Sequence, residues 1–201
     1  MPKTLHDLIH SIGTCRICEQ RFALTQTGHQ PRPVIWASAD TPNPRILIVG
    51  QAPGARVQES GRPFTDPSGN RLRDWLGIDE ATFYDKSKIA IAPMAFCFPG
   101  YNTKGADLPP PAICAKTWRK PLMDALDPVP LTLLIGGFAM KWHLGGIRKV
   151  TETVLDWKAH APQVFPLPHP SWRNTAWLKK NPWFEADVLP VLRARIQEVL
   201  T

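Results

Sequence analysis

Short continuous apolar runs alternate along the chain with stretches in which apolar residues recur at helical spacing. Uninterrupted apolar runs that end at glycine or proline are typical of buried strands; they predict strands over 45–50, 88–93, 131–136 and 164–168. Apolar residues three or four positions apart predict the face of a helix; such helices are expected over 4–12, 68–76, 110–126, 138–144, 174–180 and 182–200. The polar, proline-rich segment 20–44 is predicted to be a loop.

Strands that alternate with helices predict an α/β domain with three layers (αβα) and a mainly parallel four-stranded sheet. A chain of 201 residues, 43% apolar and 20% charged, suits one domain over 1–201 with a packed core and excludes global disorder. No apolar run approaches the roughly 18 residues of a membrane helix, and the first 15 residues are too polar for a signal peptide. We expect a soluble, cytoplasmic monomer that does not bind membranes.

The positive net charge of the chain bears on the kind of molecule that it binds. A net charge of +7 suits an anionic partner, most commonly nucleic acid, although the same charge also serves solubility alone. Several of the eight tryptophans stand in basic stretches, such as Trp118 before Arg119 and Trp172 before Arg173. Base stacking beside phosphate-binding charge needs this mixture, while half-buried tryptophans at loop edges are the simpler reading.

The four cysteines suggest a metal centre. Cys15 and Cys18 form a CxxC pair after a short helix, and Cys97 and Cys114 flank a stretch rich in proline and glycine. In a cytosolic protein this pattern indicates metal, cluster or redox chemistry before disulfides. Four thiolates can hold zinc or a [4Fe–4S] cluster; one tight pair with two distant cysteines is less typical of zinc, and free buried thiols are the third reading.

Three predicted loops leave the ends of strands, where open α/β sheets bind their ligands, and the second of them follows Pro93 and carries Cys97. Residues 50–54, Gly-Gln-Ala-Pro-Gly, can bring backbone amides close to a ligand but lack the Lys-Ser/Thr of a phosphate-binding Walker loop. His169 stands between Pro168 and Pro170 directly after the fourth strand. Its rigid position makes it a functional candidate, the alternative being a structural loop histidine.

The segment 61–69 adds an aromatic residue and two charges. Phe64 follows a proline and could stack on a flat ligand. Arg62 could contact phosphate or be solvated, and Asp66 could cap the next helix or act in catalysis.

Taken in order, these motifs resemble the uracil-DNA glycosylase superfamily, and most closely its iron–sulfur branch, family 4. Gly50–Gly54 resembles the first motif, 61–64 the segment with the base-stacking aromatic, and 169–171 the last motif. The resemblance implies a parallel four-stranded sheet between helices. It also implies that His169 stabilises the departing base anion and that Cys15, Cys18, Cys97 and Cys114 bind a [4Fe–4S] cluster, with zinc as the alternative.

The sequence departs from that pattern at three positions. Ala52 stands where the best-known branch has a water-positioning aspartate, and Gln51 where family 4 has glutamate. Glutamine is no general base, but its amide can position water or contact the base. Pro93 replaces the asparagine that reads uracil, and Asp66 or Glu59 is the candidate to replace the missing acid.

The resemblance assigns a role to each residue around the expected site. After the last motif, Trp172, Arg173 and Asn174 replace the usual wedge loop, and Trp172 or Arg173 is predicted to fill the space of a flipped base. The expected catalytic residues are His169, Gln51 and Asp66; base contacts are Gly50, Ala52, Pro53, Phe64 and Pro93; DNA contacts are Arg62, Ser171, Trp172, Arg173 and Asn174.

The function implied is a DNA glycosylase of base excision repair. It would flip uracil or another deaminated base out of damaged DNA and hydrolyse its N-glycosidic bond. A non-catalytic nucleic-acid binder on the same fold is one alternative. The other is an unrelated metal-dependent or nucleotide-processing α/β enzyme with zinc at the four cysteines.

Overall fold

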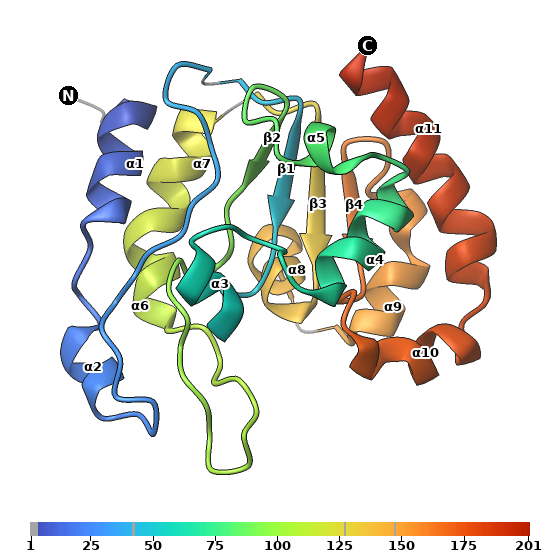
Figure 1. Cartoon of the computed structure of the whole chain (residues 1–201). Coiled ribbons are helices and arrows are strands. Elements are labelled where there is room, and N and C mark those ends of the chain that lie inside the picture. Colours follow the sequence, from blue (N-terminus) through green and yellow to red (C-terminus); the bar gives the residue numbers. More distant parts are fainter. Residues whose placement is uncertain (1–3, 42, 127, 147) are drawn as a thin grey trace.

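The computed structural model describes residues 4–41, 43–126, 128–146 and 148–201, so residues 1–3, 42, 127 and 147 of the predicted domain lie outside it. Four parallel strands form one sheet in the order β2-β1-β3-β4 (Figure 1). They are β1 (Ile46–Val49), β2 (Ile89–Ile91), β3 (Leu131–Ile135) and β4 (Val164–Leu167). The predicted three-layer α/β fold with a parallel sheet is confirmed.

Helices cover both faces of the sheet (Figure 1). α4 packs on α11 over one face, while α1 packs on α7, and α8 on β3, over the other. The α-helices are α1 (Leu5–Gly13), α2 (Glu19–Ala23), α3 (Ala55–Ser60), α4 (Pro67–Leu76), α5 (Glu80–Phe83), α6 (Ala112–Cys114), α7 (Lys120–Leu126), α8 (Gly137–Leu144), α9 (Val150–Leu155), α10 (Thr175–Lys180) and α11 (Leu189–Leu200). Shorter 3-10 and π segments are η1 (Ala115–Arg119), η2 (Trp157–Ala159), η3 (Trp172–Asn174) and η4 (Phe184–Val188).

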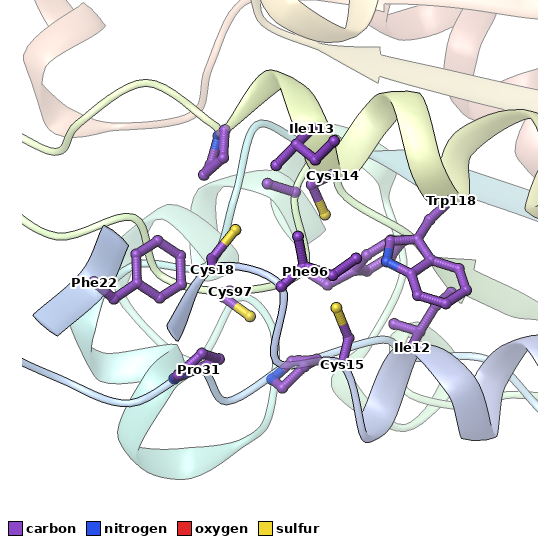
Figure 2. A pocket seen from close by; sticks show the side chains of 14 residues that line it. Ile12, Cys15, Cys18, Phe22, Pro31, Phe96, Cys97, Ile113, Cys114 and Trp118 are labelled. Atoms are coloured by element: carbon purple, nitrogen blue, oxygen red, sulfur yellow. The ribbon is translucent and has the colours of Figure 1, made fainter. Parts of the chain in front are cut away.

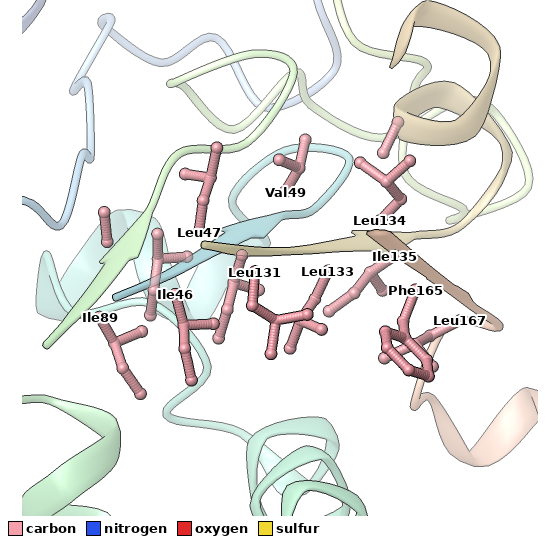
Figure 3. Packing of buried hydrophobic residues seen from close by; sticks show 14 of the residues in the cluster. Ile46, Leu47, Val49, Ile89, Leu131, Leu133, Leu134, Ile135, Phe165 and Leu167 are labelled. Atoms are coloured by element: carbon pink, nitrogen blue, oxygen red, sulfur yellow. The ribbon is translucent and has the colours of Figure 1, made fainter. Parts of the chain in front are cut away.

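The core explains why the strands read as continuous apolar runs. Side chains of β1 and β3 point into both layers, so Ile46, Leu47, Leu133 and Leu134 are all buried (Figure 3). A strand covered on both faces has no polar side to alternate with. None of the helices in the described ranges is long and apolar enough to cross a membrane.

The predicted loop over 20–44 is wrong at its start, where α2 forms. The helix has five residues, too few to show a period, and forms because Phe22 is fully buried and stacks on His29 with ring centroids 4.9 Å apart. The short helices α3, α5 and α9 were likewise not predicted.

A buried arginine fixes the end of β2. Arg119 closes the π segment η1 inside the helix predicted over 110–126, and its side chain is 1% exposed. Its Nη1 donates to the carbonyls of Ala92 (2.6 Å) and Pro93 (3.3 Å), and its Nη2 lies 3.0 Å from Nε2 of His143. Because that nitrogen must accept, His143 is neutral; burial, and then the charge of Arg119, lower its pKa to about 3.

Candidate active site

A cavity of about 110 Å³ lies at the carboxyl end of the sheet, between the loops that follow β1, β2 and β4. This is the position at which open α/β sheets bind ligands. The lining includes eight of the residues predicted for catalysis or base binding: Gly50, Gln51, Ala52, Pro53, Phe64, Asp66, Pro93 and His169. Residues more than one hundred positions apart in the sequence thus converge on one site.

The loop after β1 is tied to the loop after β2. The carbonyls of Gly50 and Gln51 accept hydrogen bonds from the N–H groups of Met94 (2.9 Å) and Ala95 (3.1 Å). The N–H groups of Gln51 and Ala52 donate to no backbone carbonyl within the described residues. This wall of the cavity therefore offers backbone donors on a rigid support.

Phe64 is held over Gly50 in an unusual backbone conformation. Its φ of 56° lies in the left-handed region, which costs a non-glycine residue of order 1 kcal/mol or more. The hydroxyl of Tyr84 donates to the carbonyls of Pro63 (2.7 Å) and Phe64 (3.0 Å) and so secures the turn. A methyl group built on Gly50 would lie 3.7 Å from Cζ of Phe64, so the tip of the ring packs against the loop after β1.

Asp66 stands at the N-cap position of α4, yet its side chain makes no capping hydrogen bond. It accepts instead from the hydroxyl of Ser68, which also lines the cavity. Of the two predicted replacements for the missing acid, Asp66 reaches the cavity; Glu59 is an exposed residue of α3 outside its lining.

His169 lines the cavity and carries a hydrogen-bond donor. Its Nδ1 accepts a hydrogen bond from the N–H of Ser171 (3.1 Å), so the proton of the neutral ring sits on Nε2. Burial lowers the pKa of His169, while the carboxylates of Asp66 and Asp107 act in the opposite direction. The side chain of Asn174 donates to the His169 carbonyl (2.8 Å) and fixes the loop.

Asp107 is a lining residue that the sequence reasoning missed. It lies on the loop between Cys97 and Cys114, which extends beyond the carboxyl end of the sheet (Figure 1). Burial raises the pKa of its carboxyl group, opposed by the charges of Arg173 and His169. The only signal in the sequence was an acidic residue on a loop already expected to border the site.

The cavity shares part of its lining with a groove of about 410 Å³ that carries most of the predicted DNA contacts. Ser171, Trp172 and Arg173 line it, and Trp172 is 72% exposed. Asn174 instead supports the loop of His169, as described above. Arg62 lies outside the lining of both cavity and groove, 3.6 Å over the Tyr84 ring and paired with Glu80 at 3.1 Å.

Comparison with protein-family models shows the family of this chain. The model of the uracil DNA glycosylase superfamily matches residues 38–193, a range that contains the whole sheet, the groove and every residue that lines the cavity except Val34. The chain belongs to the uracil DNA glycosylase superfamily. Membership suggests a glycosylase-type activity on DNA, in agreement with the broad function expected from the motifs.

The CxxC pair lies outside the range that the superfamily model matches, yet it meets the other two cysteines in space. All four line one small cavity of about 20 Å³ between the segment after α1, the loop after β2 and α6 (Figure 2). Burial, followed by the other cysteines, raises the pKa of the Cys97 thiol to about 12, and burial raises that of Cys114 to about 11. Within the described ranges, no group of three or more His, Cys, Asp or Glu is arranged to hold a metal ion, and all four thiols are free.

Proposed function

We propose that this member of the superfamily is a DNA glycosylase that removes uracil or another deaminated base. The observation that supports the proposal is that the cavity and the groove share a border. A cavity lined by Phe64 and His169 borders a groove lined by Trp172 and Arg173. A base flipped out of DNA that lies along the groove would enter the cavity, and the exposed indole of Trp172 would take its place in the stack.

The histidine and the backbone amides supply the main chemical effect. As the glycosidic bond breaks, negative charge develops on the base and positive charge on the sugar. The Nε2–H of His169 and the N–H groups of Gln51 and Ala52 are fixed donors for the base anion, and one such donor is typically worth about 2.7–4 kcal/mol. Phe64 stacks on the base and keeps it aligned.

Recognition of the base edge falls to Gln51 in this site. Pro93 lines the cavity but carries no side-chain donor or acceptor. The carboxamide of Gln51 is both a donor and an acceptor, so it can pair with the amide-like edge that uracil, hypoxanthine and xanthine share. We propose that Gln51 takes over the contact made by the missing asparagine.

A base-release assay tests the proposal. Purified protein is incubated with single- and double-stranded oligonucleotides that contain uracil, hypoxanthine or xanthine, and abasic sites are then cleaved with alkali. We expect strand cleavage at one of these lesions, with loss of cleavage but retained DNA binding in His169→Ala. Equal cleavage by His169→Ala contradicts the role of the histidine, and no release at any lesion contradicts the glycosylase.

We also propose that the four cysteines hold a [4Fe–4S] cluster, which places the protein near family 4. The donor type fits, because four thiols from three segments line one apolar cavity, although in this structure they are not arranged as a metal-binding group. A bound cluster would supply a covalent tie between α1 and the Asp107 loop. Iron and sulfide analysis of protein purified without oxygen tests this; about four of each per chain supports the cluster, while zinc alone or no metal contradicts it.

The second candidate is a nucleic-acid binder without catalysis on the same fold. It is favoured by Gln51 and Ala52, since neither can be the acid that other members carry in this motif. DNA binding by a wild type that releases no base from any lesion would support this candidate over the glycosylase.

A further inference from the structure

The cavity and the groove share a border, and that border is where a scissile bond would lie. If the base occupies the cavity and the sugar-phosphate chain the groove, the bond between them crosses the residues common to both linings. The polar side chains common to both are Asp66, Ser68, Asp107 and His169. Two carboxylates therefore stand at the position from which water must attack.

The two carboxylates differ in the hydrogen bonds that they accept. Asp66, at the N-terminus of α4, accepts a hydrogen bond from the Ser68 hydroxyl, so part of its hydrogen-bonding capacity is already used. Asp107 accepts no hydrogen bond from another described residue. Its half-buried carboxylate therefore keeps all of its lone pairs for a water molecule, whereas one oxygen of Asp66 is already bound to Ser68.

The charges around Asp107 come from three other segments. Arg173 on η3 and His169 after β4 favour the ionised carboxylate, whereas Asp66 before α4 and burial disfavour it. A carboxyl with a raised pKa is a stronger base than an exposed aspartate once it is ionised at neutral pH. Position and environment both suit proton transfer from water.

We propose that Asp107 is the catalytic base that replaces the acid missing from the loop after β1; this rests on the proposed glycosylase function. Asp107 takes a proton from water while the water oxygen bonds to C1′ of the deoxyribose. The C1′–N bond breaks, and its electron pair leaves with the base, which His169 stabilises through Nε2–H. The products are the free base, after protonation, and an abasic site with a hydroxyl on C1′.

The test measures single-turnover base release with enzyme in excess for the wild type, Asp107→Asn, Asp66→Asn and the control Asp124→Asn. Asp124 pairs with Lys120 on the exposed side of α7 and lines neither the cavity nor the groove. We expect Asp107→Asn to lower the rate about 10²–10⁴-fold, the usual contribution of a general base. The rate of the wild type should fall in acid as Asp107 is protonated, and Asp107→Asn should lose this dependence. DNA affinity should be equal or higher in Asp107→Asn.

A second variant tests the same role of Asp107 if Asp107→Asn folds poorly. Asp107→Ala leaves space for a small carboxylate, so added formate should restore part of its rate, and formate should not accelerate Asp66→Asn. An Asp107→Asn rate within about threefold of the wild type, with the acid limb intact, overturns the assignment but leaves the glycosylase standing. A larger loss in Asp66→Asn than in Asp107→Asn assigns the base to Asp66 instead. No base release by the wild type overturns both proposals.

Discussion

The position of Phe64 depends on a glycine that does not touch the proposed substrate. A Cβ added at Gly69 in α4 would lie 1.8 Å from the carbonyl oxygen of Phe64 and 2.7 Å from its carbonyl carbon. No rotamer relieves this clash, because the obstructing atoms belong to the backbone. Gly69→Ala must therefore push the turn at Phe64 away from α4.

The loss in stability can be estimated from the contacts that this movement disturbs. Overpacking a close contact costs about 1–3 kcal/mol. The displaced carbonyl also loses its hydrogen bonds from Tyr84 (3.0 Å) and Arg73 (3.5 Å), of which the shorter contributes about 1 kcal/mol. We expect Gly69→Ala to lower the free energy of unfolding by about 3 kcal/mol, a fall in Tm of about 6–12 °C for a chain of this size.

The same movement should impair base excision if the proposed function holds. Stacking of a base on an aromatic ring is worth about 1–3 kcal/mol, so losing this stacking slows base release roughly 5- to 150-fold. Thermal and urea unfolding measure the first effect, and single-turnover kinetics well below Tm measures the second. Gly13→Ala is the matched control, since its Cβ would meet nothing within 4 Å at the end of α1; it should leave stability unchanged or raise it by up to about 1 kcal/mol.

Gly69→Ala with the Tm of the wild type would refute the close approach of the Phe64 carbonyl to α4. A large fall in Tm with unchanged single-turnover kinetics would refute the separate claim that this turn positions a base-stacking ring.

Three further predictions concern the supports of the site. Arg119→Met removes the donor to the carbonyls of Ala92 and Pro93 from a buried position, so the free energy of unfolding in urea should fall by about 2–5 kcal/mol; an unchanged midpoint contradicts this. His143 has a folded-state pKa near 3, far below its ordinary 6.5, so the unfolded chain binds the proton first and stability should fall as the pH drops from 6.5 toward 3, by up to about 1.4 kcal/mol per pH unit. His143→Gln, which keeps an acceptor for Arg119, should flatten this part of the pH–stability curve; an unaltered slope argues against the burial of a neutral histidine. Trp172→Ala should weaken binding to DNA while changing stability by less than about 0.5 kcal/mol, because the ring is exposed; unchanged affinity in an anisotropy titration excludes the tryptophan from the interface.

The strands could be predicted from the sequence because burial on both faces leaves a direct mark on it. Each of the four predicted runs contains a strand, displaced by no more than one or two residues at either end. Helices α3, α5 and α9 escaped prediction because elements of four to six residues show barely one helical period. They are stabilised by tertiary contacts, such as those of the fully buried Phe83 in α5.

The candidate site likewise contains parts that the sequence predicts and parts that it does not. The loops after β1 and β4 could be predicted because they follow recognisable strands. The role of Asp107 could not be predicted, because its loop has no periodicity. Its approach to His169 depends on the path that this loop takes at the carboxyl end of the sheet. The positive φ of Phe64 and its dependence on Gly69 are likewise set by packing and leave no local pattern in the sequence.

The carboxylates at the border of cavity and groove bear on the choice between enzyme and binder. A protein that only binds DNA gains nothing from Asp66 and Asp107 beside a groove for phosphates, because negative charge there repels a polyanion. A hydrolase does gain, since water must lose a proton at this place. The same fold can therefore keep its cavity while the acid moves from the loop after β1 to another loop. Asp107→Asn separates the two readings in one variant: an enzyme loses base release while its affinity for DNA stays equal or rises, whereas a binder shows only the gain in affinity.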